Sequence, residues 1–188
     1  VNLKGFKTII LDYFYKGSPL EIILQGVSSL HLIYNSTAMR RIIGVGETVL
    51  DIIFRNDQPV KAVPGGSAFN AIVSIGRAGM PCVMATEVGD DHVGDIVTAF
   101  LRDNNVDTSY VFRAEGTQSH VSLAFLDDNN DAQYQFYKNH AVLTMHKNMP
   151  DVREGDVVLF GSFFAINPNL REYVRVFLQM AKERGAIL

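Results

Sequence analysis

From residue 41 onward, the apolar positions of the chain fall into short β-branched runs and longer runs with helical spacing. The short runs predict buried strands at residues 42–45, 82–86 and 157–160. The longer runs predict helices at residues 67–78, 92–102 and 168–184. Strands that alternate with helices are typical of a parallel sheet covered on both faces, so the sequence predicts an α/β fold.

Two further segments do not follow this alternation of strand and helix. Apolar and polar residues alternate on both sides of an acidic stretch within residues 119–137, which predicts a β-hairpin. A second short pair of strands is expected at residues 52–62, with a polar turn at residues 56–58. These segments predict a small antiparallel element beside the parallel sheet.

A glycine-paired loop precedes the helix predicted at residues 67–78. Residues 64–66 are expected to break the preceding strand, and Ser67 is the expected N-cap of the helix. Two adjacent glycines let a ligand approach the main chain, and Asn70 in the first helical turn can both donate and accept hydrogen bonds. This combination suits a polyhydroxyl ligand, although a Gly-Gly pair alone indicates only a tight turn before an amphipathic helix.

Composition narrows the class of protein. A length of 188 residues with 47% hydrophobic content is enough for one globular domain with a core. The net charge of -3 gives no electrostatic argument for a nucleic-acid or membrane partner, and no run reaches the ~18 apolar residues of a membrane span. The single cysteine, Cys82, fits a reducing cytoplasm, and the scattered histidines give no support to a zinc site.

Residues 1–38 differ from the rest of the chain. Their apolar residues come in short bursts without a sustained period, and Met39 falls immediately before the regular pattern begins. We expect a non-family extension or an upstream segment here, such as one produced by a mis-set start site. A natural extension that packs on the domain is the alternative.

Several short motifs occur in a fixed order: Gly46-Glu47, Asp51, the loop from Gly65 to Asn70, and residues 88–94 and 105–109. With them the chain resembles the ribokinase-like (PfkB) family of sugar and nucleoside kinases from about residue 39 to residue 188. The resemblance implies a ribokinase-like parallel sheet with helices on both faces, Rossmann-like and incomplete at the C-terminus. It also implies a small β-sheet lid, built from strands near residues 52–62 and 119–137, which covers the sugar and commonly makes a homodimer contact.

The resemblance also implies the substrate-binding residues. Asp51, Gly65, Gly66 and Asn70 would hold sugar hydroxyls, while Lys138 occupies a place where fructokinase-like chains often carry arginine. A lysine keeps the positive charge of arginine but loses its planar fork, so a bidentate contact is not expected. ATP and Mg²⁺ would be the cofactors of the complete enzyme.

The catalytic half of the family pattern is not recognised in the 188 residues. The family's catalytic aspartate lies in a Gly-Ala-Gly-Asp motif that this sequence lacks, and neither the nucleotide site nor the Asn-x-x-Glu magnesium region is identified. Asp90 and Asp91 are the only internal alternatives as a base, but their position predicts a helix cap. We therefore expect the N-terminal, substrate-binding part of an ATP-dependent carbohydrate kinase, with no catalytic residue or metal ligand assigned and no activity of its own. The alternatives are a nucleoside kinase of the same family and a non-catalytic sugar-binding or dimerising remnant.

Overall fold

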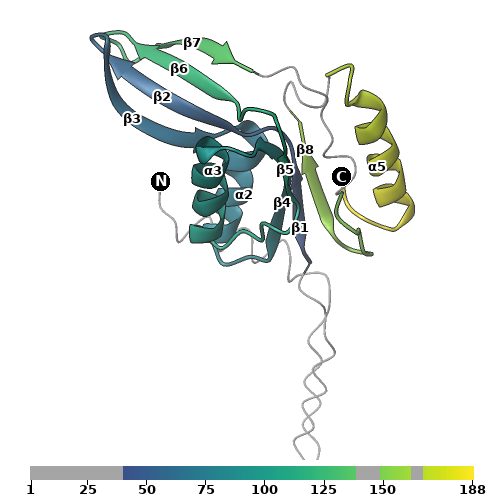
Figure 1. Cartoon of the computed structure of the whole chain (residues 1–188). Coiled ribbons are helices and arrows are strands. Elements are labelled where there is room, and N and C mark those ends of the chain that lie inside the picture. Colours follow the sequence, from purple (N-terminus) through teal and green to yellow (C-terminus); the bar gives the residue numbers. More distant parts are fainter. Residues whose placement is uncertain (1–39, 139–148, 162–166) are drawn as a thin grey trace, which may run out of the picture. The chain divides into compact units, whose positions relative to one another are not determined.

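Two sheets of four strands each organise the described part of the chain (Figure 1). The structure is a computed structural model that describes residues 40–138, 149–161 and 167–188. Arg41–Leu188 form one compact unit, and the expectations for residues 1–38 lie outside the described residues.

The first sheet is parallel and has the strand order β5-β4-β1-β8. Its central strand β1 pairs on one side with β4 and on the other with β8, and all pairings within this sheet are parallel. The strands are β1 (Ile42–Val45), β4 (Cys82–Gly89), β5 (Val111–Ala114) and β8 (Val157–Phe160). Three of them lie where the sequence predicts strands, whereas β5 was not predicted.

Helices cover both faces of the parallel sheet, which confirms the α/β fold. In Figure 1, α2 (Ser67–Arg77) and α3 (His92–Asp103) lie on one side of the sheet and α5 (Arg171–Glu183) lies on the other. One face of β1 packs through Ile43 into the core beneath α5. On the opposite face Gly44 leaves room for α2, because a Cβ at this position would lie 2.2 Å from Ile72 Cγ1.

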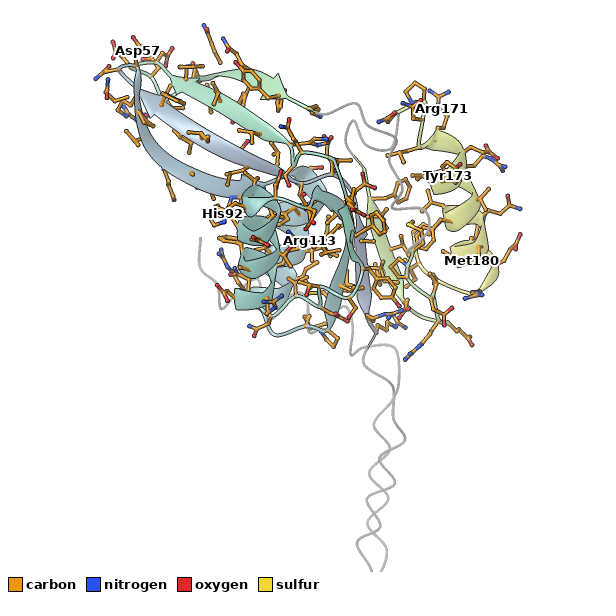
Figure 2. All side chains as sticks on the ribbon, in the orientation of Figure 1. Asp57, His92, Arg113, Arg171, Tyr173 and Met180 are labelled. Atoms are coloured by element: carbon orange, nitrogen blue, oxygen red, sulfur yellow. The ribbon has the colours of Figure 1, made fainter. Side chains whose placement is uncertain are left out.

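The second sheet, here called the small sheet, has the strand order β3-β2-β6-β7. It consists of two antiparallel hairpins, β2–β3 and β6–β7, joined by parallel pairing of β2 with β6. Asn56 and Asp57 form the first hairpin turn with φ angles of 50° and 59°, and Figure 2 labels Asp57 at its tip. The strands are β2 (Val49–Arg55), β3 (Gln58–Gly65), β6 (Val121–Leu126) and β7 (Ala132–Tyr137).

The loop before α2 differs from the sequence prediction. Strand β3 runs through Pro64 and Gly65, and only Gly66 breaks it. Proline is tolerated here because β3 is an edge strand of the small sheet, where a missing N–H removes no ladder hydrogen bond. Gly66, with φ of 129°, is the N-cap of α2, so the prediction of Ser67 as N-cap is wrong.

Helix α5 begins three residues later than predicted. Pro168 lies in a turn rather than in the first helical turn, and the Asn167 side chain accepts a hydrogen bond from the Asn169 N–H at 3.0 Å. The helix ends at Glu183 with Arg184 as its C-cap, and Gly185, which follows, has a φ of 81°. One face of the helix packs into the core, with Val174, Phe177 and Ala181 buried together with the N-cap residue Leu170.

Candidate functional site

The Asp51 carboxylate lies on β2 and is held by a residue of the neighbouring strand β6, which is distant in the sequence. The fully buried Ser122 on β6 donates its hydroxyl hydrogen bond to Asp51 Oδ1, because the parallel pairing of β2 and β6 places these two residues side by side. On the other neighbouring strand, β3, a Cβ added to Gly65 would lie only 2.5 Å from Asp51 Oδ2. The arrangement fixes a carboxylate beside the main chain, and such a group accepts hydrogen bonds from hydroxyls.

Gly66 brings the start of α2 against the loop that follows β1. A Cβ at Gly66 would lie 2.5 Å from the Glu47 carbonyl oxygen, and its φ of 129° also disfavours any other residue. No side chain among the described residues caps α2, and its first turn contains no acidic residue. The first N–H groups of a helix have no intrahelical partner, so this helix start can donate hydrogen bonds to a ligand.

Lys138 is joined to the same loop by an ion pair. Its Nζ lies 2.8 Å from Glu47 Oε2 and 5.3 Å from the centre of the Phe136 ring. Both charged side chains are about three-quarters buried, with exposed fractions of 30% for Lys138 and 23% for Glu47. The lysine is therefore anchored within the protein, close to the glycine-paired loop through Glu47.

Two pockets each contain one of the predicted site residues, Lys138 in one and Asn70 in the other. One, of about 520 Å³, is lined by Asp91, Val93, Gln118, Ser119, Val121, Tyr137 and Lys138. The other, of about 590 Å³, includes Asn70 and is lined by residues of β3, α2 and α3: Lys61, Ala62, Val63, Pro64, Val73, Ser74, Arg77, Ile96 and Phe100. The structure thus brings Asp51 to Gly65 and Lys138 to Glu47, whereas the exposed Asn70 side chain lies in a different pocket from Lys138.

Asp91 is the N-cap of α3, as the sequence predicts. Its carboxylate accepts hydrogen bonds from Gly94 N–H and from both the N–H and the hydroxyl of Ser119. Partial burial by itself raises the pKa of Asp91, but these hydrogen bonds and the nearby charge of Arg113 outweigh burial and lower the pKa below its ordinary value. The carboxylate is therefore held in its charged form at neutral pH.

Sequence reasoning missed Ser122 and Ser119 as supporting residues. Ser122 sits in an alternating stretch that predicts a strand but does not identify the partner strand, and Ser119 precedes that strand without any motif of its own. A prediction that β2 pairs with β6 would have identified Ser122.

Possible metal-ligating side chains do not cluster among the described residues. No three His, Cys, Asp or Glu side chains within residues 40–138, 149–161 and 167–188 are grouped to hold a metal. An Asn-x-x-Glu pattern does occur at Asn169 and Glu172, which the sequence reading overlooked, but Glu172 pairs with Arg175 on the exposed face of α5. We therefore assign no described residue to magnesium.

Among the described residues, no helix has both the length and the apolar character needed to cross a membrane.

The two sheets and their helices define an α/β protein in which a small second sheet stands beside a parallel sheet with helices on both faces. A family model described as pfkB family carbohydrate kinase matches residues 39–188. The chain belongs to this family, with the ribokinase-like fold that the resemblance implies.

Sugar kinases are among the known proteins to which the chain is similar. Fructokinase-1 of Oryza sativa subsp. japonica is 30% identical over 133 residues, covering 69% of this chain and 41% of the relative. A ribokinase of Bacillus subtilis (strain 168) is 32% identical over 105 residues, covering 48% of this chain and 36% of the relative. A fructokinase from Vibrio cholerae O395, solved with fructose, ADP and calcium ion bound, has a TM-score of 0.70 at 21% identity, covering 79% of this chain and 49% of that one. The chain thus spans less than half the length of these proteins.

Proposed function

We propose that this chain supplies the sugar-binding part of a fructokinase-like carbohydrate kinase, which transfers the γ-phosphate of ATP to a sugar hydroxyl. The observation that carries the proposal is the Asp51 carboxylate, held by Ser122 and placed against Gly65 in a member of the carbohydrate kinase family. Fructokinases among the similar proteins favour a ketose as the sugar.

In this proposal the described residues bind and orient the sugar. Asp51 accepts hydrogen bonds from sugar hydroxyls, and the N–H groups at the start of α2, next to Gly65 and Gly66, donate to sugar oxygens. Asn70 contacts a further hydroxyl, and Lys138 donates to the sugar while Glu47 holds its ammonium group. Orientation of the hydroxyl is a large part of phosphoryl-transfer catalysis, since the reacting oxygens must be in line.

The proton acceptor and the phosphate-binding groups are proposed to lie outside the residues described here. ATP and Mg²⁺ would supply the transferred group and neutralise its charge in the complete enzyme. The chain spans 41% of the rice fructokinase and contains no Gly-Ala-Gly-Asp motif, and both facts support this assignment. We accordingly propose that the 188 residues alone bind sugar but do not turn it over.

The small sheet is proposed to act as the lid over the sugar and as the contact of a homodimer. Exposed aromatic side chains on β7 support an interface, because Tyr134, Phe136 and Tyr137 are 54%, 58% and 58% exposed. A cytoplasmic location is part of the same proposal, supported by the buried free thiol of Cys82.

The test is ligand binding by the purified 188-residue chain, measured by calorimetry with D-fructose, D-ribose and adenosine. We expect binding of a sugar, and an Asp51→Ala variant should weaken it by about 10- to 100-fold, since a hydrogen bond to a charged group contributes ~1.5 to 3 kcal/mol. Asp128→Ala, at the exposed tip of the β6–β7 hairpin, is the matched control and should bind like the parent chain.

Three outcomes separate the proposal from its alternatives. Selective binding of adenosine would favour a nucleoside kinase, and equal loss of binding in the Asp51 and Asp128 variants would overturn the assignment of Asp51. A coupled assay for ADP release with ATP, magnesium and D-fructose should give background rates. Turnover near the ~1 to 100 s⁻¹ of ordinary kinases would show that the chain contains a base.

A further inference from the structure

Two segments of the chain, the turn between β4 and α3 and the residue before β6, meet at the carboxylate of Asp91. Gly94 N–H, at the start of α3, donates to Oδ1 at 2.8 Å. Ser119, just before β6, donates its N–H to Oδ2 and its hydroxyl to Oδ1, both at 2.7 Å. The Ser119 hydroxyl oxygen also accepts a hydrogen bond from Gly89 N–H at the end of β4, at 2.9 Å. We call this group of contacts the Asp91 clamp.

Two glycines let the backbones of the Asp91 clamp come close together. A Cβ at Gly89 would lie 2.6 Å from both the Thr117 carbonyl oxygen and the Ser119 nitrogen. A Cβ at Gly94 would lie 2.4 Å from the Gly89 carbonyl oxygen. Because these neighbours are backbone atoms, they cannot move aside independently, so the start of β6 is fixed tightly against β4 and α3.

Arg113 on β5, labelled in Figure 2, contacts the same loop. Its side chain lies 2.8 Å from Asp95 and 3.2 Å from Asp90, and it donates to the Asp91 carbonyl oxygen at 3.3 Å. Asp90 and Asp95 are each 60% exposed, and exposed ion pairs contribute little to stability. Asp90 is therefore a suitable control for Asp91: an adjacent acid of the same size in the same loop, outside the clamp.

The Asp91 clamp lies at the entry of the strand that supports Asp51. Immediately after Ser119, the His120 carbonyl accepts a hydrogen bond from Leu50 N–H at 2.9 Å, and Ser122 then pairs with Asp51. A one-residue slip of β6 would turn Ser122 to the opposite face of the small sheet. A two-residue slip would place Ala124 or His120 beside Asp51 instead.

We propose that Asp91 is a positioning residue, which fixes the register of β6 and thereby holds the Ser122 hydroxyl on the Asp51 carboxylate. The consequence for sugar binding rests on the proposed function, whereas the structural coupling between Asp91 and Asp51 does not. Asp91 also lines the pocket that contains Lys138.

The test measures the Asp51 carboxyl group directly, by its side-chain ¹³C signal in NMR spectra of the 188-residue chain. Ser122→Ala removes the donor and defines the full change of the Asp51 signal. Asp91→Asn should move this signal in the same direction, and the double variant should show no further change. Hydrogen exchange of the amides at residues 119–122 should become about 10- to 100-fold faster in Asp91→Asn, the range expected for lost hydrogen bonds to a charged group.

Two further variants keep the test decisive. Ser119→Ala removes only the hydroxyl part of the clamp, so it should give a smaller change than Asp91→Asn, and it replaces that variant if Asp91→Asn does not fold. Asp90→Asn should leave the Asp51 signal unchanged. An Asp51 signal that responds to Ser122→Ala but to neither Asp91→Asn nor Ser119→Ala in folded protein would overturn the proposal. The NMR measurement remains valid if the chain binds no sugar. Normal D-fructose affinity in a variant with a shifted Asp51 signal would refute only the proposed effect of Asp91 on sugar binding.

Discussion

The contact between Gly65 and Asp51 gives a quantitative prediction for Gly65→Ala. Gly65 lies in a strand with an ordinary backbone conformation, so alanine is excluded only by the Asp51 Oδ2 atom, 2.5 Å from the added Cβ. The carboxylate must rotate away, which breaks its hydrogen bond with Ser122 and leaves that buried hydroxyl unpaired.

The expected magnitude follows from two opposing effects. Loss of a hydrogen bond to a charged group destabilises the fold by about 1.5–3 kcal/mol. Replacing glycine by alanine within a strand stabilises the fold by roughly 0.5–1 kcal/mol, because glycine loses more conformational freedom on folding than alanine does. We therefore expect a net decrease of about 1–2 kcal/mol in the free energy of unfolding.

Urea denaturation followed by circular dichroism measures the free energy of unfolding. The control is the same Gly65→Ala substitution made in a chain that already carries Asp51→Ala. With the carboxylate removed, Gly65→Ala should be neutral or should stabilise the chain by up to about 1 kcal/mol. Equal destabilisation by Gly65→Ala in both backgrounds would refute the steric explanation and place the cause elsewhere in the β2–β3 hairpin.

Two further predictions concern titratable groups. The pKa of Asp91 is lowered below its ordinary value of 3.8, so the contribution of this carboxylate to stability is complete above pH 3.8 and is lost as the pH falls through the folded-state pKa. The urea midpoint, measured between pH 2 and 7, should therefore fall less steeply in acid for Asp91→Asn than for the parent chain. Parallel curves for the two proteins would contradict this prediction. Burial, and then the charge of Asp107, raises the pKa of Cys82 to about 11, so the native thiol should react with an aromatic disulfide reagent at pH 8 only as fast as the chain unfolds. Rapid labelling without denaturant would show that the thiol is accessible.

Local patterns predicted much of the fold. The buried face of α5 recurs at helical spacing, and the α/β alternation alone indicated a parallel sheet covered on both sides. Strand β5 was missed because four residues that include Arg113 carry too little apolar pattern. Whether Gly66 or Ser67 is the N-cap of α2 depends on the φ angle of Gly66, which is 129° and is not determined by residue type alone.

The candidate site was less predictable because its key contact is not local. Asp51 and Ser122 are 71 positions apart and meet only through the parallel pairing of two strands. Neither residue periodicity nor turn chemistry specifies a strand partner at that separation. The family resemblance indicated Asp51, Gly65, Gly66, Asn70 and Lys138 by position, and their roles in binding remain predictions.

The order of strands in the small sheet also has a consequence for synthesis on the ribosome. Strand β2 is internal in the finished sheet, but its second neighbour, β6, begins about 65 residues after β2 ends. At roughly 5–20 residues per second, one edge of the β2–β3 hairpin remains unpaired for about 3–11 s between the end of β3 and the start of β6. That edge carries Ile52, Ile53 and Phe54, the kind of apolar strand that associates with other nascent chains. The risk of aggregation in this protein is therefore concentrated in the interval before β6 is synthesised.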